Sequence, residues 1–123
     1  MRLLLDTHVL IWWDAGQRLS SAARAAIREA DEVFVSAASA WEIAIKASLG
    51  KVVSSRSVLQ ATVECGFVEL HVTFAHTEQL ATLPALHRDP FDRLLVAQAL
   101  AENLSVVTRD PAIARYRVAV IAA

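Results

Sequence analysis

The sequence is poor in the residues that several common kinds of site require. It contains a single cysteine, Cys65, so an internal disulfide is excluded and a cysteine-based zinc site is not expected. Its three glycines never fall in a phosphate-cradling or dinucleotide-binding pattern, and no serine lies in a nucleophile-elbow motif. The histidines lack the spacing of zinc ligands, and we interpret them as surface or core-edge residues: His8, His71, His76 and His87.

Long apolar runs and a strong net charge are also missing. No uncharged stretch approaches the roughly 18 apolar residues of a membrane span, and Asp6 interrupts the leucines that would otherwise resemble a signal peptide. The net charge of −1 gives no global positive field toward nucleic acid, so a polyanion would have to be held by a local patch or through metal ions. We therefore expect a cytoplasmic protein with no membrane segment.

The chain does have many apolar residues to bury. With 123 residues it is long enough for a real core, and we expect a single domain over residues 1–123. Hydrophobic residues make up 55% of the sequence, which is high for a small soluble monomer. We interpret the surplus as an apolar surface that a partner covers, although an alanine-rich but ordinary core accounts for the same composition.

Short β-rich segments alternate with amphipathic segments along the chain. Strands are expected at residues 1–5, 33–35, 67–72, 105–108 and 117–121. Helices are expected at residues 9–15, 20–30, 36–48, 54–64, 76–83 and 90–100. This alternation predicts an α/β fold with a parallel sheet and right-handed crossovers.

The segment from Arg88 to Asp110 indicates where a site would lie. Asp89 suits a helix N-cap, Pro90 suits the first helical position, and Asp92 falls in the first turn. Asp110 comes just after the strand that precedes it. In an open α/β sheet, ligands bind in the crevice beyond the carboxyl ends of the strands. The question for the rest of the chain is whether it brings more carboxylates to that edge.

Two further carboxylates qualify. Asp6 directly follows the first strand, although a turn or cap residue for the next helix explains it as well. Glu42 lies one turn into the helix at 36–48, where a capping box with Ser39 or an i, i+4 pair with Lys46 also explains it. Four carboxylates at one edge would repel one another unless a cation offset their charge, and a hard divalent ion such as Mg²⁺ prefers oxygen ligands.

Four segments, taken together and in this order, resemble the successive motifs of PIN-domain proteins, and most of all those of VapC-type toxins of bacterial toxin–antitoxin pairs. They are Leu4–His8, Ser39–Lys46 with Gly50–Lys51, Asp89–Ala99 and Val107–Asp110. The resemblance implies a three-layer α/β/α sandwich with a central parallel sheet of four to five strands. It also implies a metal-dependent endoribonuclease, the toxin of such a pair, that hydrolyses RNA phosphodiesters with a metal-activated water.

The resemblance assigns roles to individual residues. It implies that Mg²⁺, or Mn²⁺ in its place, binds a catalytic acidic quartet: Asp6, Glu42, Asp92 and Asp110. We hypothesise that Asp6 and Asp92 anchor one ion, while Glu42 and Asp110 bind through water or hold a second ion. The hydroxyl of Thr108 is placed near a metal water or a phosphate. The candidates for holding the RNA backbone, which ordinary surface charge explains equally well, are Lys46, Lys51, Arg88, Arg93 and Arg109.

The resemblance also implies three partners: an RNA substrate, a small antitoxin protein and a second copy of the chain in a homodimer. We expect the antitoxin to lie along Trp12, Trp13 and the helix at 54–64, and to reach into the acidic crevice. Because Trp12 and Trp13 are adjacent, they cannot share one helical face, so we expect one in the core and the other at an interface.

Two other functions are alternatives to a nuclease. A phosphoacceptor receiver-like domain needs an acidic pair after the first strand and a lysine after a late strand, but Asp6 is followed by Thr7 and no lysine occurs after Lys51. That function is therefore disfavoured. A non-catalytic RNA-binding or partner-binding module on the same scaffold stays open, although the presence of all four acids argues against it.

Overall fold

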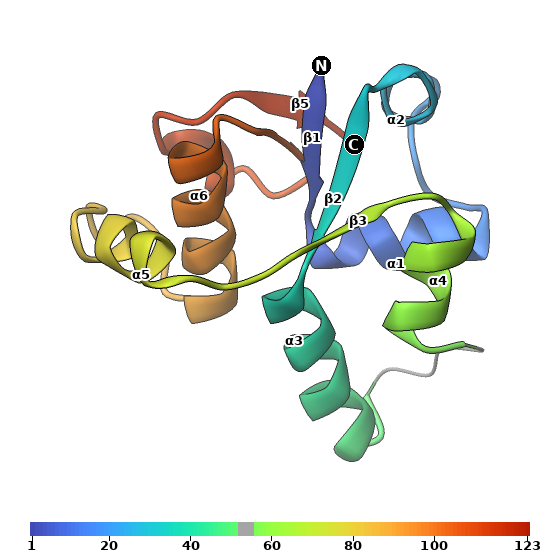
Figure 1. Ribbon diagram of the computed structural model, residues 1–123, viewed down its shortest axis with the longest axis horizontal. Helices are drawn as coiled ribbons and strands as arrows, with labels where there is room; N and C mark the ends of the chain where they lie inside the picture. Colours follow the sequence, from blue (N-terminus) through green and yellow to red (C-terminus); the bar gives the residue numbers. More distant parts are fainter. Residues whose placement is uncertain (52–55) are drawn as a thin grey trace.

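Five parallel strands form the sheet at the centre of the computed structural model, which describes residues 1–51 and 56–123 (Figure 1). They lie side by side in the order β3-β2-β1-β4-β5, and each neighbouring pair is parallel. The predicted parallel sheet of four to five strands is therefore confirmed. The strands are β1 (Arg2–Leu5), β2 (Glu32–Ser36), β3 (Val68–Leu70), β4 (Ser105–Thr108) and β5 (Val120–Ala122).

Helices connect the strands. In the same residues they are α1 (Thr7–Ala15), α2 (Ser21–Glu29), α3 (Ala37–Ser48), α4 (Val58–Glu64), α5 (Phe74–Ala81) and α6 (Pro90–Glu102), with a short 3-10 turn at Ile113–Arg115. Each helix expected from the sequence is present. The first two residues of the helix expected at 54–64 lie outside the described residues, and its observed part begins at Val58.

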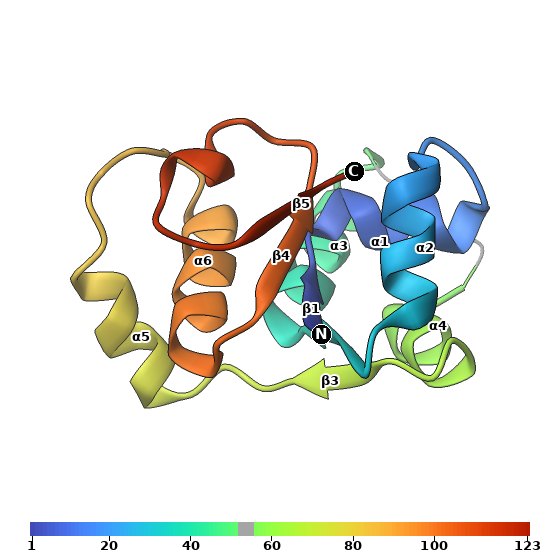
Figure 2. The ribbon, with the colours of Figure 1, turned by 90° about the horizontal axis from the view of Figure 1, so that it is seen from above.

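The sheet has an apolar cluster on each face because successive side chains of a strand point to opposite sides. Leu3 and Leu5 of β1 pack on one side with residues of α1 and α2. Leu4 packs on the other side with Leu95 and Val96 of α6. Figure 2 shows α2 and α4 on one side of β1, and α5 and α6 on the other. The predicted three-layer α/β/α sandwich is confirmed.

Short polar side chains fix the helix starts. Asp89 accepts hydrogen bonds from the backbone N–H groups of Phe91 (2.8 Å) and Asp92 (3.3 Å), so its predicted role as the N-cap of α6 is confirmed. The predicted capping role of Ser39 is wrong, because Ser36 at the end of β2 already caps α3 and leaves Ser39 buried inside the helix.

The order in which the chain adds strands to the sheet reverses between β1 and β4. From β1 it proceeds to β2 and then β3 on one side, and afterwards to β4 and β5 on the other. The carboxyl ends of β1 and β4 therefore flank a topological switch point, where open α/β sheets bind ligands. Asp6 follows β1 directly, and Asp110 follows β4 after one intervening residue.

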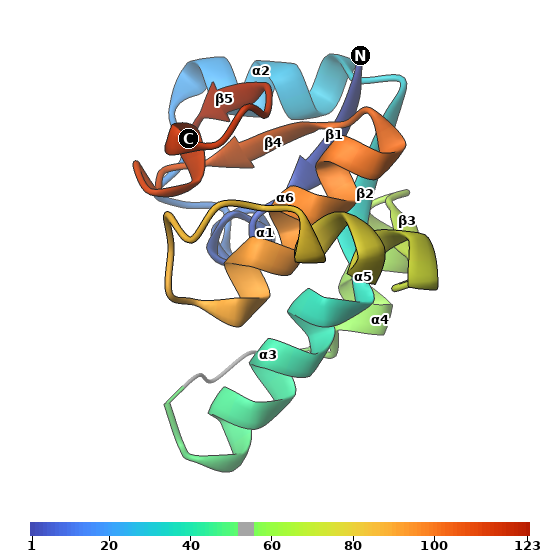
Figure 3. The ribbon, with the colours of Figure 1, turned by 90° about the vertical axis from the view of Figure 1, so that its left-hand side faces the viewer.

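Helix α3 runs away from the sheet, below the other elements in Figures 1 and 3. Its first turns lie against α6 and α1, and the rest projects outward. None of the helices in residues 1–51 and 56–123 combines the length and apolar character needed to cross a bilayer.

Candidate active site

Asp6 is fixed at the switch point by both neighbouring strands. It directly follows β1, its N–H donates to the carbonyl of Val107 on β4 (3.0 Å), and the residue is only 4% exposed. The hydroxyl of Thr108 donates to Asp6 Oδ2 at 2.7 Å. Within the described part of the chain, the buried Oδ1 atom has no hydrogen-bond partner. One oxygen of Asp6 therefore holds the side chain in place and the other is left unpaired.

Glu42 repeats this arrangement on α3. It is 3% exposed, and Lys46 Nζ donates to its Oε2 at 2.7 Å, so the predicted i, i+4 pair is confirmed. Its buried Oε1 atom has no partner among the described residues. Nearby, the hydroxyl of Thr7 donates to that of Ser39 at 2.9 Å, which ties the start of α1 to α3. This bond is the role that the structure gives Ser39.

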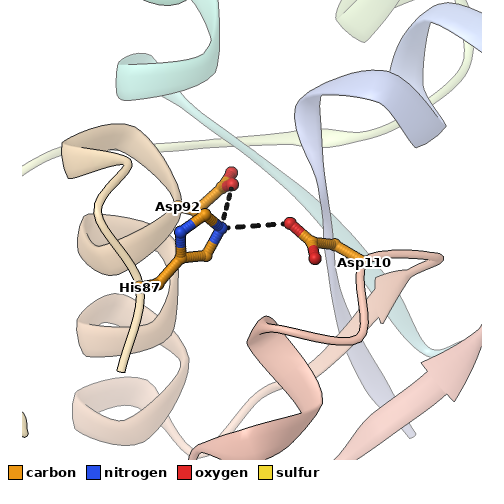
Figure 4. A group of neighbouring side chains, drawn as sticks. All are labelled: His87, Asp92 and Asp110. Atoms are coloured by element: carbon orange, nitrogen blue, oxygen red, sulfur yellow. Dashed lines mark hydrogen bonds and ion pairs between the residues drawn. The ribbon is translucent and has the colours of Figure 1, made fainter. Parts of the chain in front are cut away.

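Asp92 and Asp110 meet at a histidine. Asp92 lies in the first turn of α6, and Asp110 lies in the loop after β4, where its N–H donates to Thr108 Oγ1 (3.0 Å). His87 Nε2 lies 2.9 Å from Asp92 Oδ2 and 3.1 Å from Asp110 Oδ2, so its ring sits between the two carboxylates (Figure 4). Ligand atoms of these three side chains all lie within 4.8 Å of one another.

The carboxylates share one electrostatic environment. Burial raises the pKa of Asp92 to about 7, and the negative charges of Asp6, Asp89 and Glu42 add to the rise. Burial also raises the pKa of Asp6, although the hydrogen bond from Thr108 opposes it. Since Asp6 and Glu42 both act on Asp92, the structure brings these acids into one neighbourhood, with Asp110 joined to Asp92 through His87.

The pKa of His87 lies above its ordinary value. Burial alone lowers it, but the hydrogen bond to Asp110 and the charges of Asp92, Asp110 and Asp89 outweigh that effect. In the metal-free protein the site thus carries an excess of negative charge. Bound protons and two nearby nitrogen donors, Lys46 and His87, offset this charge.

The residues present fit a divalent cation. Two buried carboxylate oxygens that have no partner in residues 1–51 and 56–123, Asp6 Oδ1 and Glu42 Oε1, lie near a carboxylate that holds a proton more tightly than usual. An oxygen-rich acidic donor set of this kind suits Mg²⁺ or Mn²⁺. The sequence-based hypothesis pairs Asp6 with Asp92 on one ion, whereas the most compact set in the structure joins Asp92 to Asp110 and His87.

Sequence reasoning missed His87. Its spacing to the other histidines excludes a zinc site, so the sequence predicts only a surface or core-edge residue there. A signal was available nonetheless: His87 stands two residues before the N-cap Asp89, in the loop that enters the helix carrying Asp92. A residue at that position lies at the same edge of the sheet as the acids.

Four of the candidate RNA contacts, Lys46 among them, have partners inside the protein. Thr108 is 2% exposed, and its hydroxyl bridges Asp6 and the N–H of Asp110. Arg93 Nη1 donates to the carbonyl of Pro84 at 2.9 Å. The guanidinium of Arg109 lies over the ring of Trp12, 4.4 Å from its centroid, and also donates to the carbonyls of Arg18 and Ala123. The remaining basic candidates are the half-buried Lys46, which pairs with Glu42, and the exposed Lys51 and Arg88.

The predicted division of roles between the adjacent tryptophans differs from the structure. Trp12 and Trp13 are both half-buried: Trp12 lies under Arg109, and Trp13 lies beside Phe67 with 6.0 Å between ring centroids. The most exposed tryptophan is Trp41, at 62%. It stands next to Glu42, and its ring meets the ring of Phe91 edge-on at 5.1 Å.

Comparison with known proteins supplies the family. The model of the PIN domain family matches residues 3–119. The chain is similar to Ribonuclease VapC22 of Mycobacterium tuberculosis, with 36% identity over 120 residues that cover 94% of this chain and 92% of that protein.

Solved structures share the fold. VapBC2 from Rickettsia felis, bound to a DNA fragment from its promoter, matches 99% of this chain and 98% of its own with a TM-score of 0.72 and 15% identity. FitAcB from Neisseria gonorrhoeae matches 97% and 96% with a TM-score of 0.66 and 20% identity. A toxin–antitoxin complex from Klebsiella pneumoniae matches 97% and 95% with a TM-score of 0.67 and 17% identity. Given the family match and a relative at 36% identity, the chain belongs to the PIN domain family.

Proposed function

We propose that this protein is a divalent-metal-dependent endoribonuclease and the toxin of a toxin–antitoxin pair. The observation that carries the proposal is the meeting of carboxylates at the switch point of the sheet, with two buried oxygens left unpaired on Asp6 and Glu42. The ribonuclease relative favours RNA as the substrate, and the toxin–antitoxin complex of similar fold favours an antitoxin as the partner.

Each acid contributes in its own way. A divalent cation, when bound, supplies an activated water and offsets charge on the phosphoryl oxygens. Asp6 and Glu42 offer their unpaired oxygens, because Thr108 and Lys46 hold the other oxygen of each side chain. Asp92 and Asp110 complete the oxygen donors at the open side of the crevice. The role of the fold is to hold these oxygens in place before the ion and the RNA arrive.

The RNA backbone is held by cations around the acids. Lys46 stands beside Glu42 and is one-third exposed, while Arg88 is exposed one residue after His87. Lys51 is a third candidate at the far end of α3. Contacts of this kind position an RNA without reading its sequence.

A nuclease assay tests the proposal. The purified chain is incubated with single-stranded RNA and Mg²⁺ or Mn²⁺, with and without EDTA, beside the variants Asp6→Asn and Asp92→Asn. We expect cleavage by the wild type that EDTA and either variant abolish. Binding of RNA without cleavage under all conditions would favour the non-catalytic module, and cleavage by both variants at the wild-type rate would refute the site.

An apolar groove offers a place for the antitoxin. It measures about 360 Å³ between α4, β3 and the start of α3. Leu59 and Val63 line it and are 69% and 67% exposed. Helix α4 lines this groove, so we still expect it to contact the antitoxin. Trp12 and Trp13 do not line the groove. We expect Leu59→Asp to weaken antitoxin binding in a pull-down while the nuclease rate stays unchanged.

We expect a second copy of the chain to bind at the outer face of α3. Trp41, Ile45 and Leu49 recur every four residues and are 62%, 37% and 63% exposed. A stripe of large apolar side chains at helical spacing, on a helix that projects from the body (Figure 3), suits a self-complementary contact. Light scattering on Ile45→Asp, which we expect to be monomeric beside a dimeric wild type, tests this assignment.

A further inference from the structure

The imidazole of His87 occupies the space between two of the proposed metal ligands. Its Nε2 atom lies 2.9 Å from Asp92 and 3.1 Å from Asp110, and the side chain is 18% exposed. Its other nitrogen, Nδ1, lies 3.2 Å from the backbone nitrogen of Asp89. Figure 4 shows the ring held between the helix that carries Asp92 and the loop that carries Asp110.

The backbone contact decides what the ring presents to the acids. The N–H of Asp89 donates to Nδ1, so the lone pair of Nδ1 is in use and Nδ1 carries no hydrogen. The hydrogen of a neutral ring then sits on Nε2, which faces the two carboxylates. In this arrangement His87 donates a hydrogen bond to Asp110, keeps Nε2 within 2.9 Å of Asp92, and has no lone pair to offer a metal ion there.

We propose that His87 takes the place of a cation between Asp92 and Asp110 in the metal-free protein, and that a divalent ion uses these two carboxylates only after displacing it. The inference rests on the proposed function, because it assumes that this edge of the sheet binds a cation. An N–H that donates to Asp110 and lies close to Asp92 reduces the repulsion between the two carboxylates. Loss of that N–H raises the free energy of the metal-free site and leaves the metal-bound site unaffected.

The other two acids need no such displacement. Each has one oxygen bonded within the protein and one unpaired buried oxygen: Oδ1 of Asp6 and Oε1 of Glu42. The site therefore has a half that is open to a cation and a half that His87 closes. Removal of the imidazole opens the second half, so His87→Ala is expected to bind a divalent ion more tightly than the wild type.

His76 provides a matched control. Its Nδ1 also accepts a backbone N–H, that of Thr73 (3.1 Å), and its Nε2 also faces a carboxylate, that of Glu102 (2.9 Å). The pair lies at the opposite end of α6 from Asp92, ten residues or about 15 Å along the helix. His76 thus has a similar hydrogen-bond pattern, with the amide of Gln98 as a further neighbour of Nδ1 at 3.3 Å, in a place where no cation is proposed to bind.

Mn²⁺ titration followed by the electron paramagnetic resonance signal of the free ion tests the inference. The proteins are the wild type, His87→Ala, His87→Gln and Asp92→Asn. We expect about tenfold tighter binding by His87→Ala, which corresponds to about 1.4 kcal/mol. The amide of glutamine restores a donor of similar reach, so His87→Gln should bind Mn²⁺ with nearly wild-type affinity. His87 lies in a loop, so both variants are expected to fold.

Thermal unfolding separates displacement from a purely structural role. Without metal, His87→Ala should melt below the wild type, and saturating Mn²⁺ should remove most of the difference, because a tighter ligand stabilises more at equal concentration. His76→Gln should melt below the wild type by the same amount with and without Mn²⁺.

Each other outcome has a definite meaning. Unchanged or weaker Mn²⁺ binding by His87→Ala overturns the inference, and so does a ¹⁴N coupling in the pulsed spectrum of bound Mn²⁺ that this variant loses, since His87 would then be a ligand. In both cases the proposed cation site stands, provided that Asp92→Asn weakens binding. If the wild type binds no Mn²⁺, or Asp92→Asn binds it equally well, the proposed site and the inference both fail.

Discussion

The two halves of the acidic edge are built differently. Asp6 and Glu42 are 4% and 3% exposed, and strand pairing or a helix places each of them before any ligand arrives. Asp92 and Asp110 are more open, with side chains 14% and 33% exposed, and they meet through His87. The first half is fixed by the core, while the second depends on a loop.

This difference separates two tasks. Burial holds the oxygens of Asp6 and Glu42 in place, at the cost of two acceptors that have no partner among the described residues and destabilise the metal-free protein. The looser half is more open to solvent, and we propose that RNA enters on this side. A site with one buried, fixed pair of carboxylates and one more exposed, adjustable pair can hold an ion and still exchange substrate and product.

The largest effect on the rate of RNA cleavage is expected from substitutions that remove one carboxylate charge from either half. Asp6→Asn and Asp92→Asn should each slow RNA cleavage by about 10²–10³-fold or more, because each removes an electrostatic contact with the cation. Single-turnover cleavage assays measure this effect, with Glu69→Gln as a control in an exposed carboxylate of β3. If only one half matters to the rate, the two variants will differ and the comparison fails.

The next prediction concerns the rigid half. Thr108→Val removes the hydroxyl that donates to Asp6 and accepts from the N–H of Asp110. We expect the free energy of unfolding to fall by about 1–3 kcal/mol, the scale of an unpaired buried polar group. Urea denaturation measures this loss, and Thr108→Ser, which keeps the hydroxyl, should recover most of it. Equal stability of the valine variant and the wild type would show that Asp6 is not held as described.

The looser half should show a pH dependence. Because the pKa of Asp92 is raised from 3.8 to about 7, the folded protein keeps a proton that the unfolded chain has already released. The contribution of Asp92 to stability is therefore full below about pH 4 and is lost as the pH rises through 7. Asp92→Asn, compared with the metal-free wild type, should be relatively more stable at pH 8 than at pH 4. Thermal unfolding at both pH values checks this prediction, and a parallel pH profile of the two proteins would contradict it.

The smallest expected effect is at Lys46. Lys46→Met removes the partner of a buried carboxylate, but the lysine is 34% exposed and solvent screens the pair. We expect the metal-free protein to lose roughly 0.5–1 kcal/mol of unfolding free energy, and the loss to shrink when Mg²⁺ is added. Lys46→Arg is the conservative control. A loss that Mg²⁺ leaves unchanged would place Glu42 outside the cation site.

Much of this arrangement could be predicted from local sequence signals. The alternation of short β-rich and amphipathic segments gave the parallel sheet, and Asp89 followed by Pro90 identified the start of α6. These signals work because caps and buried strands depend on neighbours in sequence. The capping box predicted from Ser39 failed because Ser36, at the end of β2, was already available three residues earlier.

The remaining features depend on contacts between distant segments. The bond from Thr108 to Asp6 joins residues 102 apart, and the bridge from His87 to Asp110 joins residues 23 apart. Neither contact leaves a recognisable pattern in a single sequence. The same applies to Arg109, whose guanidinium lies over Trp12 instead of facing solvent. Pattern reasoning could predict that acids gather at one edge, because strand ends and helix starts share it, but it could not show which donors hold them.

The most direct test of the account is a crystal structure of the protein soaked in Mn²⁺, with anomalous diffraction used to locate the ion. We expect an anomalous peak at the carboxyl edge of β1 and β4, bounded by Asp6, Glu42, Asp92 and Asp110, with His87 moved from its place between the last two. A peak on another face of the molecule, or no peak at saturating Mn²⁺, would contradict the account.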